Sequence, residues 1–89
     1  MEVIVKNPSE SEISAMKNKP TWECGVSKFN WFYDSEETCL LTDGEVIIEY
    51  GENNSKSVSI KAGDLVTFPQ GLACVWDVKK PVRKHYVFR

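Results

Sequence analysis

The sequence predicts an all-β protein: one antiparallel barrel or two-sheet sandwich, with a single short helix near the N-terminus. Three observations predict this class. Short runs rich in β-branched and aromatic residues recur along most of the chain. Glycine, asparagine and proline residues separate these runs at even spacing, as turns do. The chain has 89 residues, the length of one domain, and we assign residues 1–89 to a single domain.

The N-terminal segment is predicted to hold an edge strand and the helix. Residues 2–6 alternate charged and branched side chains, as a half-buried strand does. Ser9 and Glu12 have the spacing of a capping box, which marks the start of a helix. Met16 lies on the thin apolar face of this helix, and we expect the helix to end before Pro20.

After Pro20 the predicted strands follow one another almost without interruption. We expect them near residues 21–26, 29–34, 38–41, 45–50, 57–60, 64–68, 73–78 and 82–88. The intervening turns fall at residues 43–44, 51–54, 62–64 and 69–71, where glycine and asparagine permit positive φ. Many short strands at even spacing favour a sandwich or a small barrel.

The composition excludes several classes of function. The net charge is −2 and the basic residues form no stripe, so we expect no nucleic-acid partner. No run approaches the ~18–20 apolar residues of a membrane span, so we expect no membrane partner. Three cysteines without a recognisable secretory signal favour reduced thiols and a cytoplasmic location. A core this small gains stability from association, and we expect a homodimer.

The turn residues keep the spacing of two known motifs. Glu37 and Gly44 are separated by six residues. A second series consists of Gly63, Pro69, Gly71 and Cys74, with five, one and two residues between them. This pattern resembles the two cupin motifs, G-x5-H-x-H-x3,4-E-x6-G and G-x5-P-x-G-x2-H-x3-N. The resemblance covers most of the chain and implies an RmlC-like cupin fold, an antiparallel β-barrel built as a double-sheet jelly roll with the short helix at its N-terminus.

Two further segments narrow the resemblance. Residues 31–34 and 82–86 resemble a branch of small, single-domain cupins that groups with the cupin domain of ureidoglycine aminohydrolase. The small members of this branch are largely uncharacterised. The resemblance therefore implies a fold more strongly than an activity.

The departures from the cupin motifs concern the metal ligands. Trp31 and Tyr33 stand where the first motif has two histidines, and Cys74 stands where the second motif has one. Of the four usual ligands only Glu37 remains. Residues 38–41 also lack the histidines that the ureidoglycine enzyme places after its glutamate. One carboxylate and one thiolate are too few ligands for the usual geometry, so we expect no metal and no other cofactor.

Strand alternation predicts which side chains face the barrel interior. With the former histidine positions pointing inward, the interior holds Trp31, Tyr33, Glu37, Cys74 and Trp76, with Lys84 at its edge. We predict that these residues bind a ligand, because aromatic walls with a few polar groups are typical of small-molecule sites. An enclosed Glu37 needs a partner, such as Lys84 or a tyrosine hydroxyl group. We also expect Glu37 and Cys74 to face each other across an open pocket.

The residues leave four functions open, of which we favour a module that binds a small polar molecule inside the barrel. The second is an aminohydrolase- or isomerase-like enzyme without a metal, with Glu37 as general base and Cys74 or Tyr33 as a second catalytic group. The third is a metalloenzyme with an altered ligand set of Glu37, Cys74 and His85. The fourth is a structural or interaction protein whose aromatic side chains fill the barrel.

Overall fold

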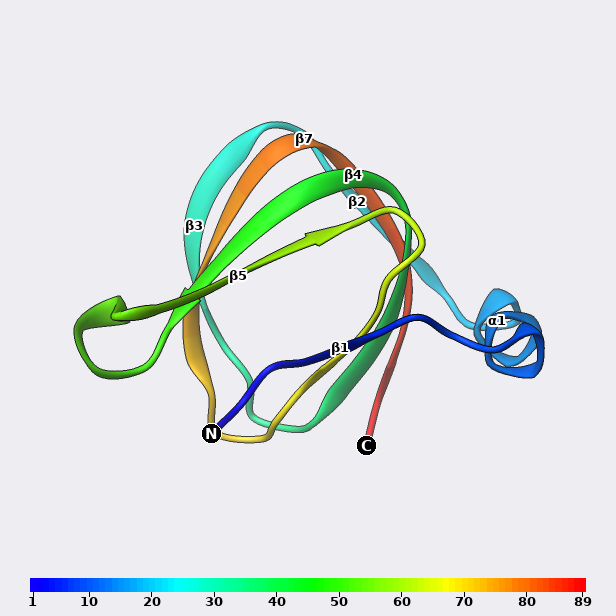
Figure 1. Ribbon diagram of the computed structural model, residues 1–89, viewed down its shortest axis with the longest axis horizontal. Helices are drawn as coiled ribbons and strands as arrows, with labels where there is room; N and C mark the ends of the chain where they lie inside the picture. The colour runs from blue at the N-terminus through cyan, green and yellow to red at the C-terminus, as the bar shows by residue number, and fades with distance from the viewer.

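The computed structural model describes all 89 residues and contains seven β-strands, one α-helix and one short 3-10 helix. The elements in chain order are β1 (Ile4–Lys6), α1 (Glu10–Lys17), β2 (Thr21–Cys24), β3 (Ser27–Phe32), β4 (Glu37–Tyr50), η1 (Glu52–Asn54), β5 (Lys56–Lys61), β6 (Leu65–Phe68) and β7 (Ala73–Phe88). The strands curve around a common interior, with α1 outside it on one side (Figure 1). The predicted all-β class with a short N-terminal helix is therefore confirmed.

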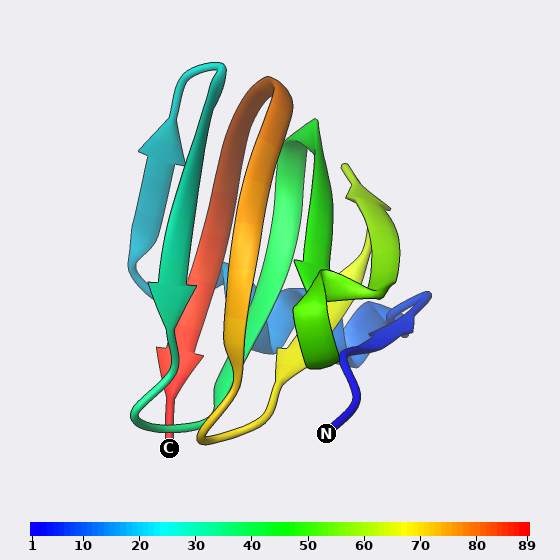
Figure 2. The ribbon, with the colours of Figure 1, turned by 90° about the vertical axis from the view of Figure 1, so that its left-hand side faces the viewer.

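All strand pairs are antiparallel, and the two long strands hold the fold together. The order of the sheet is β1-β6-β4-β7-β2, with β3 also paired to β7 and β5 also paired to β4. β2 pairs with the second half of β7 and β3 pairs with its first half. Figure 2, turned by 90° from the view of Figure 1, shows β2, β3, β7, β4 and β5 side by side. One edge of the sheet is thus made of two successive strands along β7.

β4 and β7 each replace two predicted strands. The sequence predicted separate strands at residues 38–41 and 45–50, but β4 runs through the predicted turn with register shifts between Leu41 and Val46. Extra residues in a bulge bend a strand without ending it. Gly44 has a φ of 97°, and an added Cβ there would meet the backbone of Pro81 and lie 2.7 Å from the Cα atom of Val82. Only glycine permits this close approach of the two bent strands.

The hydrophobic core occupies the interior enclosed by the bent strands. The main cluster consists of fourteen buried residues. Twelve lie in β4, β5, β6 and β7, and Tyr33 and Leu72 lie in the connections between strands. The full set is Tyr33, Cys39, Leu41, Val46, Ile48, Tyr50, Ile60, Val66, Phe68, Leu72, Cys74, Trp76, Val78 and Val82. A smaller cluster of Met16, Leu40 and Leu65 joins the helix to the outside of the barrel. The main cluster is rich in aromatic side chains, and these delimit the site described below.

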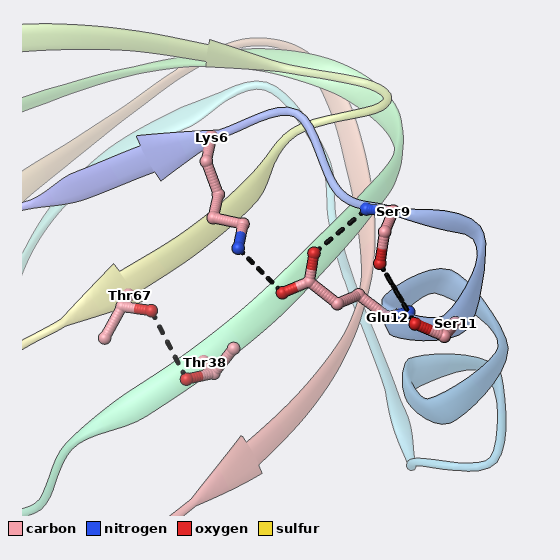
Figure 3. A network of polar contacts seen from close by, with 6 residues as sticks. All are labelled: Lys6, Ser9, Ser11, Glu12, Thr38 and Thr67. Atoms are coloured by element: carbon pink, nitrogen blue, oxygen red, sulfur yellow. Dashed lines mark hydrogen bonds and ion pairs between the residues drawn. The ribbon is translucent and has the colours of Figure 1, made fainter.

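The helix begins as predicted. The Oγ atom of Ser9 accepts a hydrogen bond from the backbone N–H of Glu12 at 3.2 Å, and the Glu12 carboxylate accepts one from the backbone N–H of Ser9 at 2.9 Å (Figure 3). Lys6 pairs with the other carboxylate oxygen at 2.8 Å, which links β1 to the helix. The predicted capping box is confirmed. None of the helical segments has the length and hydrophobicity that a membrane span requires.

Candidate functional site

A pocket of about 240 Å³ lies among β2, β3, β4 and β7. Nine residues line it: Trp22, Phe29, Trp31, Tyr33, Glu37, Trp76, Lys84, Tyr86 and Phe88. Seven of the nine carry aromatic side chains. Glu37 and Lys84 are the only charged residues in the lining. The site is therefore an aromatic pocket with one acidic and one basic group.

Strand alternation and strand pairing together explain how these residues meet. Every second residue of a strand faces the same side, and Trp76, Lys84 and Tyr86 share one parity along β7. The pairing of β3 with β7 places Phe29 opposite Trp76, and the pairing of β2 with β7 places Trp22 opposite Lys84. Phe29 stacks on Trp76 with ring centroids 6.2 Å apart, and Trp22 meets Trp76 edge-on at 5.9 Å.

A buried ion pair forms the polar part of the pocket. The Nζ atom of Lys84 donates a hydrogen bond to the Oε2 atom of Glu37 at 2.7 Å, and the two side chains are only 8% and 2% exposed. The ammonium group also lies 4.6 Å from the ring centroid of Trp76, 5.0 Å from that of Trp22 and 6.0 Å from that of Tyr86. These ring faces stabilise the positive charge by cation–π interaction. A charge this deeply buried requires such compensation.

Two polar atoms of the pocket residues have no hydrogen-bond partner. They are the Oε1 atom of Glu37 and the Nε1 atom of Trp76, and both are buried. Leaving a buried polar atom unpaired costs about 1–3 kcal/mol, and more for a charged group. Such atoms are rare in folded proteins. The indole N–H of Trp76 lies near the Cys74 thiol, which belongs to the core. The Oε1 atom of Glu37 is thus the unpaired acceptor that a ligand in the pocket could satisfy.

Burial holds the other titratable groups near the pocket in their neutral forms. Burial raises the pKa of the Tyr33 hydroxyl group far above its ordinary value, and the negative charge of the Glu37 carboxylate and a hydrogen bond to it raise the pKa further. Burial likewise raises the pKa of the Cys39 thiol to about 12 and that of the Cys74 thiol to about 11. Since the thiolate is the reactive form of cysteine, both thiols are poor nucleophiles at neutral pH.

The structure brings five of the six residues predicted to bind a ligand into this pocket. They are Trp31, Tyr33, Glu37, Trp76 and Lys84. The side chain of Trp31 is 49% exposed and lies at the rim instead of inside the barrel. Lys84 was predicted at the edge of the site, whereas it lies at the centre of the polar pair.

Cys74 is buried as strand alternation predicts, but it belongs to the hydrophobic core and not to the pocket lining. The expectation that it faces Glu37 across the pocket is therefore wrong. The physical reason lies in aromatic packing. Tyr33 stacks on Phe68 at 4.8 Å, and Phe68 lies 5.6 Å from Trp76, so these rings fill the part of the barrel that a smaller set of side chains would leave open.

Sequence reasoning missed four lining residues. They are Trp22, Phe29, Tyr86 and Phe88. Strand alternation could have found them, because Tyr86 and Phe88 share the parity of Lys84, and Phe29 shares that of Trp31 and Tyr33. The sequence holds no signal for the division of β7 between β2 and β3, and this pairing is what brings their aromatic residues together.

The barrel of two long, bent strands with shorter strands paired to them places the protein among the small cupins. The sequence pattern of the family described as the EutQ-like cupin domain matches residues 12–86. The chain therefore belongs to this family.

Solved structures agree with this assignment. A DUF861 family protein from Thermotoga maritima is 41% identical, with a TM-score of 0.92 over 99% of this chain and 100% of the other. The EutQ protein of Clostridium difficile is 25% identical, with a TM-score of 0.68 over 76% of this chain and 52% of the other. A DUF861 family protein of unknown function from Pseudomonas syringae is 28% identical, with a TM-score of 0.67 over 78% of this chain and 29% of the other. No curated protein matches the chain.

The residues at the cupin ligand positions do not fit a divalent metal. No group of three or more His, Cys, Asp and Glu residues lies together in a way that could hold a metal ion. Glu37 already has a cationic partner in Lys84, and Cys74 is a buried thiol with a pKa raised to about 11. His85 bonds to the backbone carbonyl oxygen of Lys19 at 2.9 Å. The altered ligand set of Glu37, Cys74 and His85 is therefore not assembled, and we derive no chemistry through a metal.

Proposed function

We propose that the protein binds a small polar molecule in the aromatic pocket around Glu37 and Lys84. The single observation that carries this proposal is the buried Oε1 atom of Glu37, a charged acceptor without a partner in the lining of a pocket. A ligand with a hydrogen-bond donor would remove the cost of that unpaired atom. The pocket volume of about 240 Å³ lies below the usual range for drug-sized ligands, so the ligand is small.

A barrel filled only for stability is the main competing explanation. A purely structural barrel gains nothing from a buried ion pair, since well-packed apolar residues of similar volume are often equally stable or more so. It also gains nothing from leaving one carboxylate oxygen unpaired. Both features have a purpose if the pair recognises a ligand.

An enzyme is the second candidate, because a buried carboxylate with a free oxygen atom can act as a general base. In this alternative Glu37 takes a proton from a bound substrate, and the neutral Tyr33 hydroxyl group is a second candidate group in the same lining. Residues 31–34 and 82–86 resemble a branch of small cupins that groups with the cupin domain of ureidoglycine aminohydrolase, and this supports an aminohydrolase- or isomerase-like reaction. The place of Cys74 in the core and its raised pKa make it the weaker partner.

Native mass spectrometry tests the proposed binding. The protein, purified from its own cells without chelator, should carry a small non-covalent ligand. Glu37→Gln should lose that ligand, because the charged acceptor is gone. Glu36→Gln is the matched control: it makes the same chemical change one residue away, at a half-buried position that pairs with Arg89 at 3.4 Å and lies outside the pocket lining.

The outcomes separate the candidates. Loss of the ligand in Glu37→Gln but not in Glu36→Gln supports a binding site at Glu37. A wild-type protein that never carries a ligand, together with a strongly destabilised Glu37→Gln variant, would leave the structural barrel as the explanation. Conversion of the released ligand to a product by wild-type protein but not by Glu37→Gln would favour the enzyme.

A further inference from the structure

We infer that the pocket recognises the cis-amide edge of a small, planar, uncharged ring, as in a six-membered lactam. The ring N–H donates to the Oε1 atom of Glu37, and the ring carbonyl oxygen accepts from the Nζ atom of Lys84. This inference rests on the proposed function, because it names the ligand class of the same site.

The ion pair of Glu37 and Lys84 limits which hydrogen bonds a ligand can form in the pocket. A carboxylate only accepts hydrogen bonds, and an ammonium group only donates them, with three N–H groups. One N–H of Lys84 is used by the Oε2 atom of Glu37, and no other hydrogen bond of this ammonium group is present. The site therefore offers one free carboxylate acceptor beside free ammonium donors. A complementary ligand carries a donor and an acceptor.

The spacing of these groups selects the arrangement within the ligand. The Nζ atom of Lys84 lies 2.7 Å from the Oε2 atom of Glu37, and Oε1 belongs to the same carboxylate group. A ligand that contacts both Oε1 and Nζ therefore needs its donor and its acceptor close together on one edge. An open-chain secondary amide is trans, with N–H and C=O on opposite sides. A lactam ring forces the cis form and places both on one edge. Bidentate contacts of this kind add geometric specificity to the hydrogen-bond energy.

The charge balance excludes most ionic ligands. Glu37 and Lys84 neutralise each other, and no other charged residue lines the pocket. A ligand with a net charge would leave one uncompensated charge among aromatic rings, which is costly away from water. A carboxylate ligand would in addition be repelled by Glu37. An uncharged ligand meets neither penalty.

The walls determine the shape of the ligand. Seven of the nine lining residues are aromatic, and aromatic faces pack best against planar rings. The volume of about 240 Å³ equals roughly eight water molecules at ~30 Å³ each, which is enough for a single ring. Trp31 and Phe88 at the rim are 49% and 46% exposed. Exposed side chains change rotamer readily, so a ring can enter between them and reach the buried Oε1 atom.

The indole N–H resonances of isotope-labelled protein report binding directly, because all three tryptophans of the chain line the pocket. The probes are 2-pyridone, its N-methyl derivative, which has the same ring without the donor, and benzoate, which is planar but charged. We expect 2-pyridone to shift the Trp76 and Trp22 resonances in a saturable way. N-methyl-2-pyridone and benzoate should bind at least tenfold more weakly, since a hydrogen bond to a charged group is lost or a charge is left uncompensated.

The double variant Glu37→Met with Lys84→Met removes both charges together and keeps two side chains of similar length. It should fold, because replacing a buried pair as a whole is far milder than breaking it. The preference for 2-pyridone over its N-methyl derivative should fall to about onefold in this variant and stay unchanged in Glu36→Gln. Equal binding of the two pyridones by wild-type protein, or tighter binding of benzoate, overturns the inference and leaves the proposed binding function intact. No response to any of the three probes also overturns the inference, and the proposed binding function is then judged by whether native mass spectrometry finds a ligand that Glu37→Gln loses.

Discussion

Replacing Lys84 with methionine removes the ammonium group and keeps an unbranched side chain of similar length. At 2.7 Å, and with an effective dielectric constant of about 20, the attraction between Lys84 and Glu37 is about 6 kcal/mol before the cost of removing both charges from water. The variant leaves the Glu37 carboxylate, which is 2% exposed, without its cationic partner. Breaking a buried pair in this way costs about 3–5 kcal/mol. That is a large part of the ~5–15 kcal/mol by which native proteins are stable.

Urea denaturation followed by tryptophan fluorescence measures this effect. Lys84→Met should lower the free energy of unfolding by about 3–5 kcal/mol, whereas Glu37→Met with Lys84→Met should lose less than Lys84→Met alone. Lys28→Met is the matched control, because Lys28 pairs with Glu49 at 3.6 Å on the surface, where its side chain is 60% exposed. Its effect should be within about 1 kcal/mol. A Lys84→Met variant as stable as Lys28→Met would refute the argument for a buried, mutually dependent pair.

Four further predictions concern the backbone, the thiols, metal and association. Gly44→Ala should lower the free energy of unfolding by several kcal/mol, because the added Cβ atom would clash with the backbone of β7. Gly63 has the same φ of 97° but open space around its Cβ position, so Gly63→Ala should cost only about 1–2 kcal/mol. Equal effects of the two variants in urea titrations would contradict the backbone clash. Cys24 should react with a thiol reagent in the native state, whereas the buried Cys39 and Cys74 should react slowly. The rate for Cys74 should rise about tenfold per pH unit towards its pKa of about 11. Equal rates for the three thiols would contradict the burial of Cys39 and Cys74. Elemental analysis should find far less than one divalent metal ion per chain, and a stoichiometric metal would contradict the interpretation of the donor set. Light scattering at micromolar concentration should give the mass of a homodimer, and a constant mass of 10.1 kDa would exclude it.

Local signals in the sequence were sufficient for the fold class and for the helix. The capping box of Ser9 and Glu12 depends on residues three positions apart, and the structure contains it. Strand alternation correctly placed Tyr33, Glu37 and Trp76 in the interior, because the direction of a side chain follows from its parity within one strand.

Features that depend on distant parts of the chain were beyond this reasoning. The residues around Gly44 have the local pattern of a turn between two strands. The chain bends there within β4 instead, because the backbone of Pro81 in β7 packs against Gly44. The exclusion of Cys74 from the pocket depends on how Phe68 and Trp76 pack, which no local pattern contains. Lys84 moved from the predicted edge to the centre because its ammonium group is drawn to the Glu37 carboxylate and the surrounding rings.

A high-resolution crystal structure of the protein soaked with 2-pyridone would show whether the Oε1 atom of Glu37 accepts a hydrogen bond from a ligand. We expect electron density for one planar ring between the aromatic walls, with its nitrogen atom within about 3.2 Å of the Oε1 atom of Glu37 and its carbonyl oxygen near the Nζ atom of Lys84. A pocket closed by its own side chains, with Oε1 bonded to the Tyr33 hydroxyl group, would contradict the claim that this acceptor is kept free for a ligand.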